Sequence, residues 1–169
     1  MPNTSITNSF SANTRIRSAA VNANFTDTIT YTGCHVTLAA QLSNLTNNVD
    51  TLLDFDTETW DEGDNFDTGN NRFVVPVTGY YKVIVCATFI NTIADTFYRT
   101  MIFKGGSAVA QNIVHTASTA SVTSLIHVDY VFTAGDFIYG YVKSNSGGNT
   151  VDVTNTGSLT YMNVLFLGT

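Results

Sequence analysis

The chain has 169 residues and a formal net charge of −6, with seven lysines and arginines against thirteen aspartates and glutamates. Only 12% of the residues are charged, about half the usual share of a soluble domain, whereas 44% are hydrophobic. The seven basic residues are scattered, and binding to a phosphate backbone needs clustered Lys and Arg, so no nucleic acid is expected as a partner. No run of about 18 apolar residues is present, so no membrane insertion is expected.

The first 33 residues are polar and hold no convincing strand, so residues 1–33 are expected to form a separate N-terminal attachment segment. Ser18 is a suitable N-cap for a short helix that would place Val21 and Phe25 on one face. A helix this short is not stable alone, so it must pack on its own domain, a sister subunit or another protein. Val21 and Phe25 are therefore attachment candidates. No apolar signal region is seen, which favours a protein that acts where it is made or leaves the cell within an assembly.

Residues 34–169 show a different pattern, in which short strands alternate with turn residues such as Thr78-Gly79 and the Ala-Gly-Asp of 134–136. About eight to ten strands without an intervening helix predict a β-sandwich or barrel. The clearest strands are predicted at 72–77, 80–90, 97–103, 122–132, 137–143 and 159–167, with shorter ones at 35–40, 50–55, 108–114 and 150–153.

Four segments of this domain stand out, FDTGNNRFVVPVTGYYKVIV at 66–85, IFKGGSAV at 102–109, VFTAGDFIYGYV at 131–142 and LTYMNVLFL at 159–167. In order and spacing they resemble segments of the globular head of the complement first component q subunit, a relative of the tumour-necrosis-factor jelly rolls. The sequence departs from the family at Asn163, where the last strand usually has glycine near the trimer axis. The positions that match the family's characteristic residues are Phe66, Phe73, Pro76, Gly79, Tyr81, Gly106, Gly135, Asp136 and Tyr161.

The resemblance implies an all-β fold, a ten-stranded jelly-roll β-sandwich that is homotrimeric and carries a short N-terminal extension. The family packs apolar sheet faces around a threefold axis, which is consistent with cyclic closure of identical subunits. Aromatic residues in strands suit both a sandwich core and such an interface. The candidates for the trimer interface or the core are Tyr81, Tyr139, Tyr141, Tyr161 and Leu165.

Acidic residues gather at 54–67, and the spacing of Asp54, Asp56 and Glu58 superficially resembles a calcium loop. The glycine at position 6 and the glutamate at position 12 of that loop are missing. We therefore favour a solvated acidic stripe along an extended strand, and calcium binding by these three carboxylates is the weaker alternative.

No constellation for catalysis stands out in the sequence. His35, His115 and His127 have no second ligand at short spacing, so no metal site is expected from them. The chain has no G-x-S-x-G elbow and no phosphate-cradling glycine motif, and nothing marks a carboxylate as a buried acid. Cys34 and Cys86 are too few for a disulfide scaffold, and Cys86 lies in an apolar run that predicts a core thiol. We expect neither enzymatic activity nor, apart from the calcium alternative, a cofactor.

The stretch SFSANTRIRSAAVNANF at 9–25 resembles short segments that recur in phage tail and fibre proteins. Together with the complement-head resemblance, it favours a virion protein made in the host cytoplasm, either a bacteriophage trimeric fibre head or a capsid decoration protein. Residues 1–33 would dock on other virion proteins, and the jelly roll would stabilise the particle or adhere to a host-surface glycan or protein. The alternative is a secreted bacterial or eukaryotic ligand-recognition module of the adhesive, complement-head type.

Overall fold

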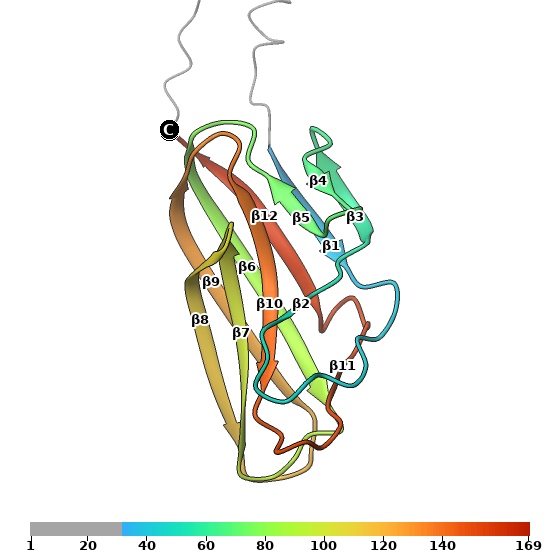
Figure 1. Ribbon diagram of the computed structural model, residues 1–169. Helices are drawn as coiled ribbons and strands as arrows, with labels where there is room; N and C mark the ends of the chain where they lie inside the picture. The colour runs from blue at the N-terminus through green and yellow to red at the C-terminus, as the bar shows by residue number, and fades with distance from the viewer. Residues whose placement is uncertain (1–31) are drawn as a thin grey trace, which may run out of the picture.

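A computed structural model describes residues 32–169, which form two antiparallel sheets packed face to face with no helix in that range (Figure 1). Sheet A has the order β3–β1–β12–β6–β9, and the short β11 pairs with the end of β6. Its strands are β1 (Gly33–Thr37), β3 (Thr57–Glu62), β6 (Gly79–Ile90), β9 (Val122–Phe132), β11 (Asp152–Val153) and β12 (Tyr161–Gly168).

Sheet B has the order β4–β5–β10–β7–β8, and the short β2 pairs with β10. The jelly-roll sandwich that the sequence predicted is confirmed; within the described range it has twelve strands, six in each sheet, rather than the expected ten, and β2, β4 and β11 are only two residues long. The strands of sheet B are β2 (Thr51–Leu52), β4 (Phe66–Asp67), β5 (Arg72–Val74), β7 (Thr96–Lys104), β8 (Ser107–Thr116) and β10 (Phe137–Ser144).

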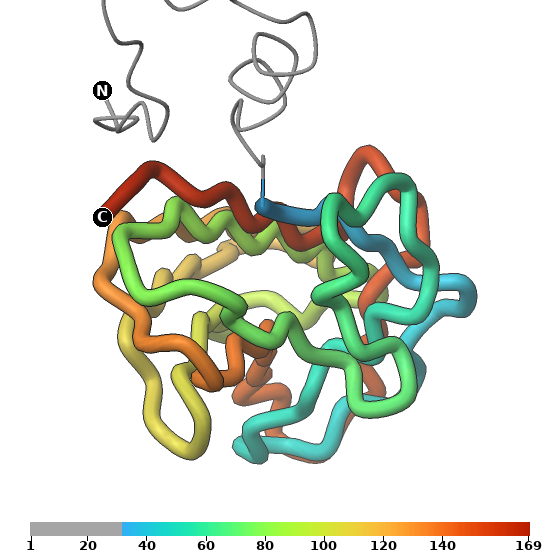
Figure 2. The backbone as a smooth tube through the Cα atoms, turned by 90° about the horizontal axis from the view of Figure 1, so that it is seen from above, coloured from blue at the N-terminus to red at the C-terminus, as the bar shows by residue number. Residues whose placement is uncertain are grey.

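The core lies between the two sheets, which Figure 2 shows as separate layers seen from above. Successive residues of a strand point to opposite sides of its sheet, so each strand contributes alternate side chains to the core. In β10, for example, Ile138 and Val142 are fully buried, while Tyr139 and Tyr141 on the other side are half-buried. The largest fully buried side chains are Tyr81, Tyr98, Phe55, Phe73, Phe89 and Phe132.

Tyr81 is the centre of an aromatic group in this core. Its ring lies edge-on to those of Phe73 and Phe132, with centroids 6.2 Å and 6.0 Å away. Its hydroxyl donates a hydrogen bond of 2.8 Å to the carbonyl oxygen of Val77. Burial raises the pKa of Tyr81. The phenol therefore stays neutral and satisfied inside an apolar layer, as buried tyrosines require.

Most predicted strands are confirmed, and the strand predicted at 122–132 has the bounds of β9. The strand predicted at 50–55 is reduced to the two residues of β2. The edge strand β3 was not predicted, because its sequence TETWDE is acidic and poor in β-branched apolar residues. The helix expected around Val21 and Phe25 lies outside the described residues. No helix that could cross a membrane exists within residues 32–169.

Both ends of the described domain lie at the same end of the sandwich (Figure 1). The N–H of Phe166 in β12 donates a 2.9 Å hydrogen bond to the carbonyl oxygen of Thr32, which holds the entering chain beside the last strand. The connection between β8 and β9 lies at the opposite end. Residues 32 and 169 therefore lie at one end of the sandwich, and the β8–β9 connection lies at the other.

Candidate interaction surface

The outer side of sheet A is the most apolar exposed surface of the described domain, and we call it the A face. Of the eleven large hydrophobic side chains that are clearly exposed among the described residues, six lie on it. Tyr80 is 53% exposed and Leu165 is 40% exposed. Concentrations of this kind mark interaction surfaces. The six are Trp60, Tyr80, Leu125, Val131, Leu165 and Leu167.

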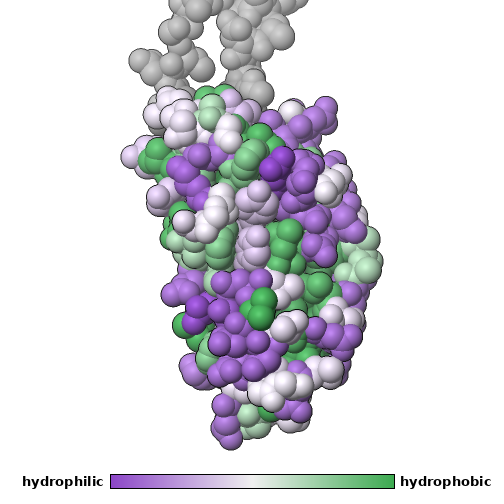
Figure 3. All heavy atoms as spheres, viewed as in Figure 1, coloured by the Kyte–Doolittle hydropathy of each residue, from purple (hydrophilic) through white to green (hydrophobic). Residues whose placement is uncertain are grey.

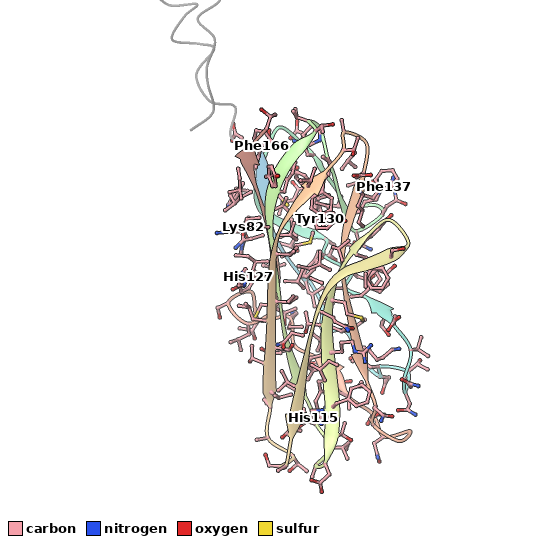
Figure 4. All side chains as sticks on the ribbon, turned by 90° about the vertical axis from the view of Figure 1, so that its left-hand side faces the viewer. Lys82, His115, His127, Tyr130, Phe137 and Phe166 are labelled. Atoms are coloured by element: carbon pink, nitrogen blue, oxygen red, sulfur yellow. The ribbon has the colours of Figure 1, made fainter. Side chains whose placement is uncertain are left out.

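The strand register arranges the A face in rows that run across the sheet. In one row Ile84 of β6 lies between His127 of β9 and Asn163 of β12, and His35 and Trp60 follow on β1 and β3. In the stick view, Lys82 and His127 project outward from sheet A, whereas Phe137 projects from the opposite side of the sandwich (Figure 4). The A face thus combines an apolar surface with a central polar row.

The centre of this row is a hydrogen-bonded pair. Nδ1 of His35 lies 2.6 Å from Oδ1 of Asn163, and the imidazole ring lies 5.4 Å from the ring of Tyr161. Desolvation by burial, and to a lesser extent the nearby Cys86, raise the pKa of Tyr161. Charged groups are few here, with Lys82 and Asp129 directly opposite each other on β6 and β9. Depletion of charge is typical of the core of a protein–protein interface.

The outer side of sheet B, which we call the B face, carries a row of rings along β10. The ring centroids of Phe137 and Tyr139 are 6.5 Å apart, and those of Tyr139 and Tyr141 are 6.2 Å apart. Phe103 of β7 packs 4.4 Å from Tyr141. The guanidinium of Arg72 lies 3.9 Å above the Phe137 ring. Aromatic rings and cations together make this face chemically distinct from the A face.

The five candidate residues for interface or core lie in three different places. Tyr81 is in the core, as described above. Tyr161 and Leu165 are on the A face, whereas Tyr139 and Tyr141 are on the B face, on the other side of the sandwich. The structure therefore does not bring them together in one surface, and Val21 and Phe25 lie outside the described residues. Sequence reasoning included Tyr80 among the strand tyrosines suited to an interface but missed Leu125, Val131 and Leu167, which alternation along β9 and β12 places on the same face as Leu165.

The calcium candidates do not form a cluster. Oδ1 of Asp56 accepts a 2.6 Å hydrogen bond from the backbone N–H of Ala39, and Oδ1 of Asp54 accepts one of 3.3 Å from the side chain of Asn71. Glu58 is exposed on the edge strand β3. Within the part of the chain that the structure describes, no three His, Cys, Asp or Glu side chains are placed to hold a metal ion. Asp54 and Asp56 thus serve as hydrogen-bond acceptors that hold neighbouring loops.

Both thiols are inaccessible. Cys34 and Cys86 are buried and form no disulfide. Desolvation, and for Cys34 also the negative charge of Asp61, raises the pKa of each thiol. A thiol must ionise to act as a nucleophile, so these positions are poor candidates for covalent chemistry.

The described domain is a jelly-roll sandwich whose fold is similar to that of tumour-necrosis-factor and complement-head structures. Solved structures similar to this chain include those of murine APRIL and of the Eiger TNF from S. frugiperda. The TM-scores are 0.62 and 0.59, at 13% and 12% identity, and the matches cover 81% and 82% of this chain and 99% and 94% of theirs.

The globular domain of the zebrafish complement 1qA protein is also similar, with a TM-score of 0.53 at 11% identity, covering 81% of this chain and 97% of that domain. This likeness confirms, at the level of the fold, the resemblance inferred from the four sequence segments. No family model matches the sequence, and no curated protein has a significant sequence match.

Proposed function

We propose that this chain is a non-enzymatic structural and binding protein that assembles as a homotrimer through the A face. The observation that carries the proposal is the concentration of exposed Tyr80, Leu125, Val131, Leu165 and Leu167 on one flat side of the sandwich. Burying such side chains is the main favourable term in association. Threefold closure would use the same surface on every subunit and leave none uncovered. The jelly-roll likeness supports this, because the family that the sequence resembles is trimeric.

The polar row on the A face would then set the register between subunits. His35 is already hydrogen-bonded to Asn163, so its ring orientation is fixed before association. In a separate row of the same face, Lys82 and Asp129 offer one charge of each sign, which favours one arrangement of the subunits over the others. In this proposal the apolar residues supply most of the affinity, and the polar row supplies the specificity.

The setting that we propose is a virus particle, on which the chain is a bacteriophage fibre head or a capsid decoration protein. Residues 1–33 would dock on other virion proteins. Both ends of the described domain lie at one end of the sandwich, which would direct the other end away from the particle (Figure 1). The proposal for the setting rests on the resemblance of residues 9–25 to phage tail and fibre segments.

A second candidate is a secreted ligand-recognition module, bacterial or eukaryotic. The row of rings and cations on the B face favours it, because an exposed aromatic and basic surface suits a ligand. The two candidates share the homotrimer and differ in where the protein acts. Finding the chain in purified particles would support the first, and finding it free outside producing cells would support the second.

The mass of the protein in solution tests the homotrimer. Light scattering should give about three times the chain mass of 18.3 kDa for the full chain. Leu165→Asp on the A face should shift the mass to that of a monomer without loss of the folded circular dichroism spectrum. Ile113→Asp is the matched control, because Ile113 is similarly exposed, at 42%, but lies on β8 of sheet B. A monomeric wild type at micromolar concentration would overturn the proposal, and a trimeric Leu165→Asp would assign the contact to another face.

Whether the chain is incorporated into virus particles tests the proposal that it acts on a virion. Because β1 begins at Gly33, the deletion should remove residues 1–31 and leave the domain whole. We expect the shortened chain to form trimers that no longer join the particle. Normal incorporation of the shortened chain would contradict the attachment role of the N-terminal segment.

A further inference from the structure

Two cations lie directly opposite each other on the B face. Arg99 of β7 pairs in register with Lys143 of β10. Like charges in directly opposed positions destabilise a sheet. Nζ of Lys143 lies 2.9 Å from Oδ1 of Asp50, but Arg99 forms no ion pair with any residue in the range 32–169. Two cations and one carboxylate leave one positive charge uncompensated at this point.

Arg99 also has an unused hydrogen-bond donor. Its Nε is buried and has no hydrogen-bond partner among the described residues. Buried donors are almost always paired, because leaving one unpaired costs about 1–3 kcal/mol. The guanidinium is a planar fork that matches a carboxylate. An incoming carboxylate would therefore compensate the charge of the guanidinium, whereas Nε itself lies too deep for a ligand to reach in this structure.

Aromatic rings lie on the same face as the two cations, along β7 and β10. The guanidinium carbon of Arg99 lies 5.6 Å from the centroid of the Phe97 ring. Further along the strands, the close pair of Phe103 and Tyr141 is followed by Tyr139. All four rings are half-buried, so part of each is accessible. The ring faces are apolar and carry negative charge density, which suits the C–H groups of a sugar ring.

The pairing of β10 limits the kind of ligand. β10 is hydrogen-bonded to β7 on one side and to β5 and β2 on the other, so a peptide cannot add to it as a further strand. The side of the molecule that Figure 3 presents, which is the sheet B side, shows hydrophobic residues in separate patches among hydrophilic ones. A mixed surface of this kind suits a polar ligand better than a dry protein interface.

From these features we propose that the B face binds a glycan that bears a carboxylate group. The carboxylate lies on Arg99 and Lys143, and adjoining sugar rings pack on Tyr141, Phe103 and Tyr139. Only the number of glycan sites in the assembly rests on the proposed function, because a trimer joined by its A faces leaves three B faces exposed. Weak single sites then add up to strong adhesion.

Calorimetric titration of the full chain provides the test. The probes are a galacturonic acid hexasaccharide and sialyllactose, with galactose hexasaccharide and lactose as neutral counterparts. We expect at least one acidic probe to bind, with its neutral counterpart about tenfold weaker or more, since a hydrogen bond to a charged group contributes that much. Arg99→Gln and Lys143→Gln should each weaken the acidic probe by about tenfold. Lys104→Gln, a matched loss of one cation at the end of β7 where Nζ is ion-paired with Asp136, should leave it unchanged.

Each contrary result overturns the inference. The inference is overturned if neither acidic probe binds, or if acidic and neutral probes bind equally well. It is also overturned if Arg99→Gln binds the acidic probe as tightly as the wild type does. Tighter binding of a hexaglutamate peptide than of either glycan would assign the face to an acidic peptide instead. If the charge variants fail to fold, Tyr141→Leu serves in their place and should weaken binding about tenfold. Light scattering on the same samples separates this failure from failure of the homotrimer, because B-face variants should keep the wild-type mass.

Discussion

Nδ1 of His35 lies 2.6 Å from Oδ1 of Asn163 and joins β1 to β12 on the A face. An amide oxygen can only accept, so in this arrangement Nδ1 of His35 donates the hydrogen bond to Oδ1 of Asn163. Asn163 stands where the family that the sequence resembles usually has glycine. The departure from the family is therefore tied to a specific contact, which a glycine could not make.

The first prediction concerns this pair. Asn163→Ala and His35→Ala should each lower the free energy of unfolding, and the double-mutant cycle should give a coupling of about 1 kcal/mol. Urea unfolding at one fixed protein concentration measures it, since association affects apparent stability. A coupling near zero would mean that the contact contributes nothing measurable.

The second prediction concerns close approach of β1 to β12. A Cβ on Gly33 would collide with the carbonyl oxygen of Val164, which is backbone and cannot move aside. Gly33→Ala should therefore lower the free energy of unfolding by more than about 3 kcal/mol. Gly106→Ala is the matched control, because a Cβ there meets nothing within 4 Å and its φ is not positive. It should change stability by less than about 0.5 kcal/mol. Equal effects of the two substitutions in thermal unfolding would contradict the prediction.

The third prediction concerns the thiols. Because burial raises the pKa of Cys34 and Cys86, neither should react with a thiol reagent at pH 8 until the protein unfolds. The unfolded thiols ionise above their ordinary pKa of about 8.5 while the folded ones stay neutral. The free energy of unfolding that is linked to these thiols is therefore fully present below about pH 8.5 and decreases as the pH rises above that value. The reactivity of the thiols is measured with an aromatic disulfide reagent, which releases a coloured thiolate when it reacts with a cysteine, in the absence and presence of urea. Rapid reaction of the folded protein would show that the sites open readily.

The fourth prediction concerns Asp136 in the turn between β9 and β10. Desolvation is the largest single effect on its pKa and raises it, but the hydrogen bonds from Lys104 and from the N–H of Thr133, together with the charge of Lys104, outweigh this and lower the pKa. A lowered pKa contributes stability that is present above about pH 4 and is lost as the pH falls through the folded pKa. Asp136→Asn should therefore flatten the loss of stability between about pH 4 and pH 2. Unfolding curves across that range test it, with Asp95→Asn, an exposed loop carboxylate with no ion pair in residues 32–169, as the control. An unaltered pH profile would exclude Asp136 as a contributor.

The strands could be predicted from the sequence because local signals define them. Alternating apolar residues and turn glycines such as Gly79 and Gly135 mark β6, β9 and β10 within a few residues. The edge strand β3 could not be predicted in this way. It is acidic, and pairing with β1 rather than its own composition makes it a strand.

The sequence by itself determined an all-β domain, since periodicity and turn chemistry are local properties, and four of its segments resemble the complement head. It did not determine which surface each residue occupies. Tyr81, Tyr139 and Tyr161 look alike in the sequence, yet they lie in the core, on the B face and on the A face. A period of two tells which residues of a strand share a side, but only long-range pairing decides which sheet the strand joins. That pairing brings His35 to Asn163 and Arg99 to Lys143, and with them both candidate surfaces.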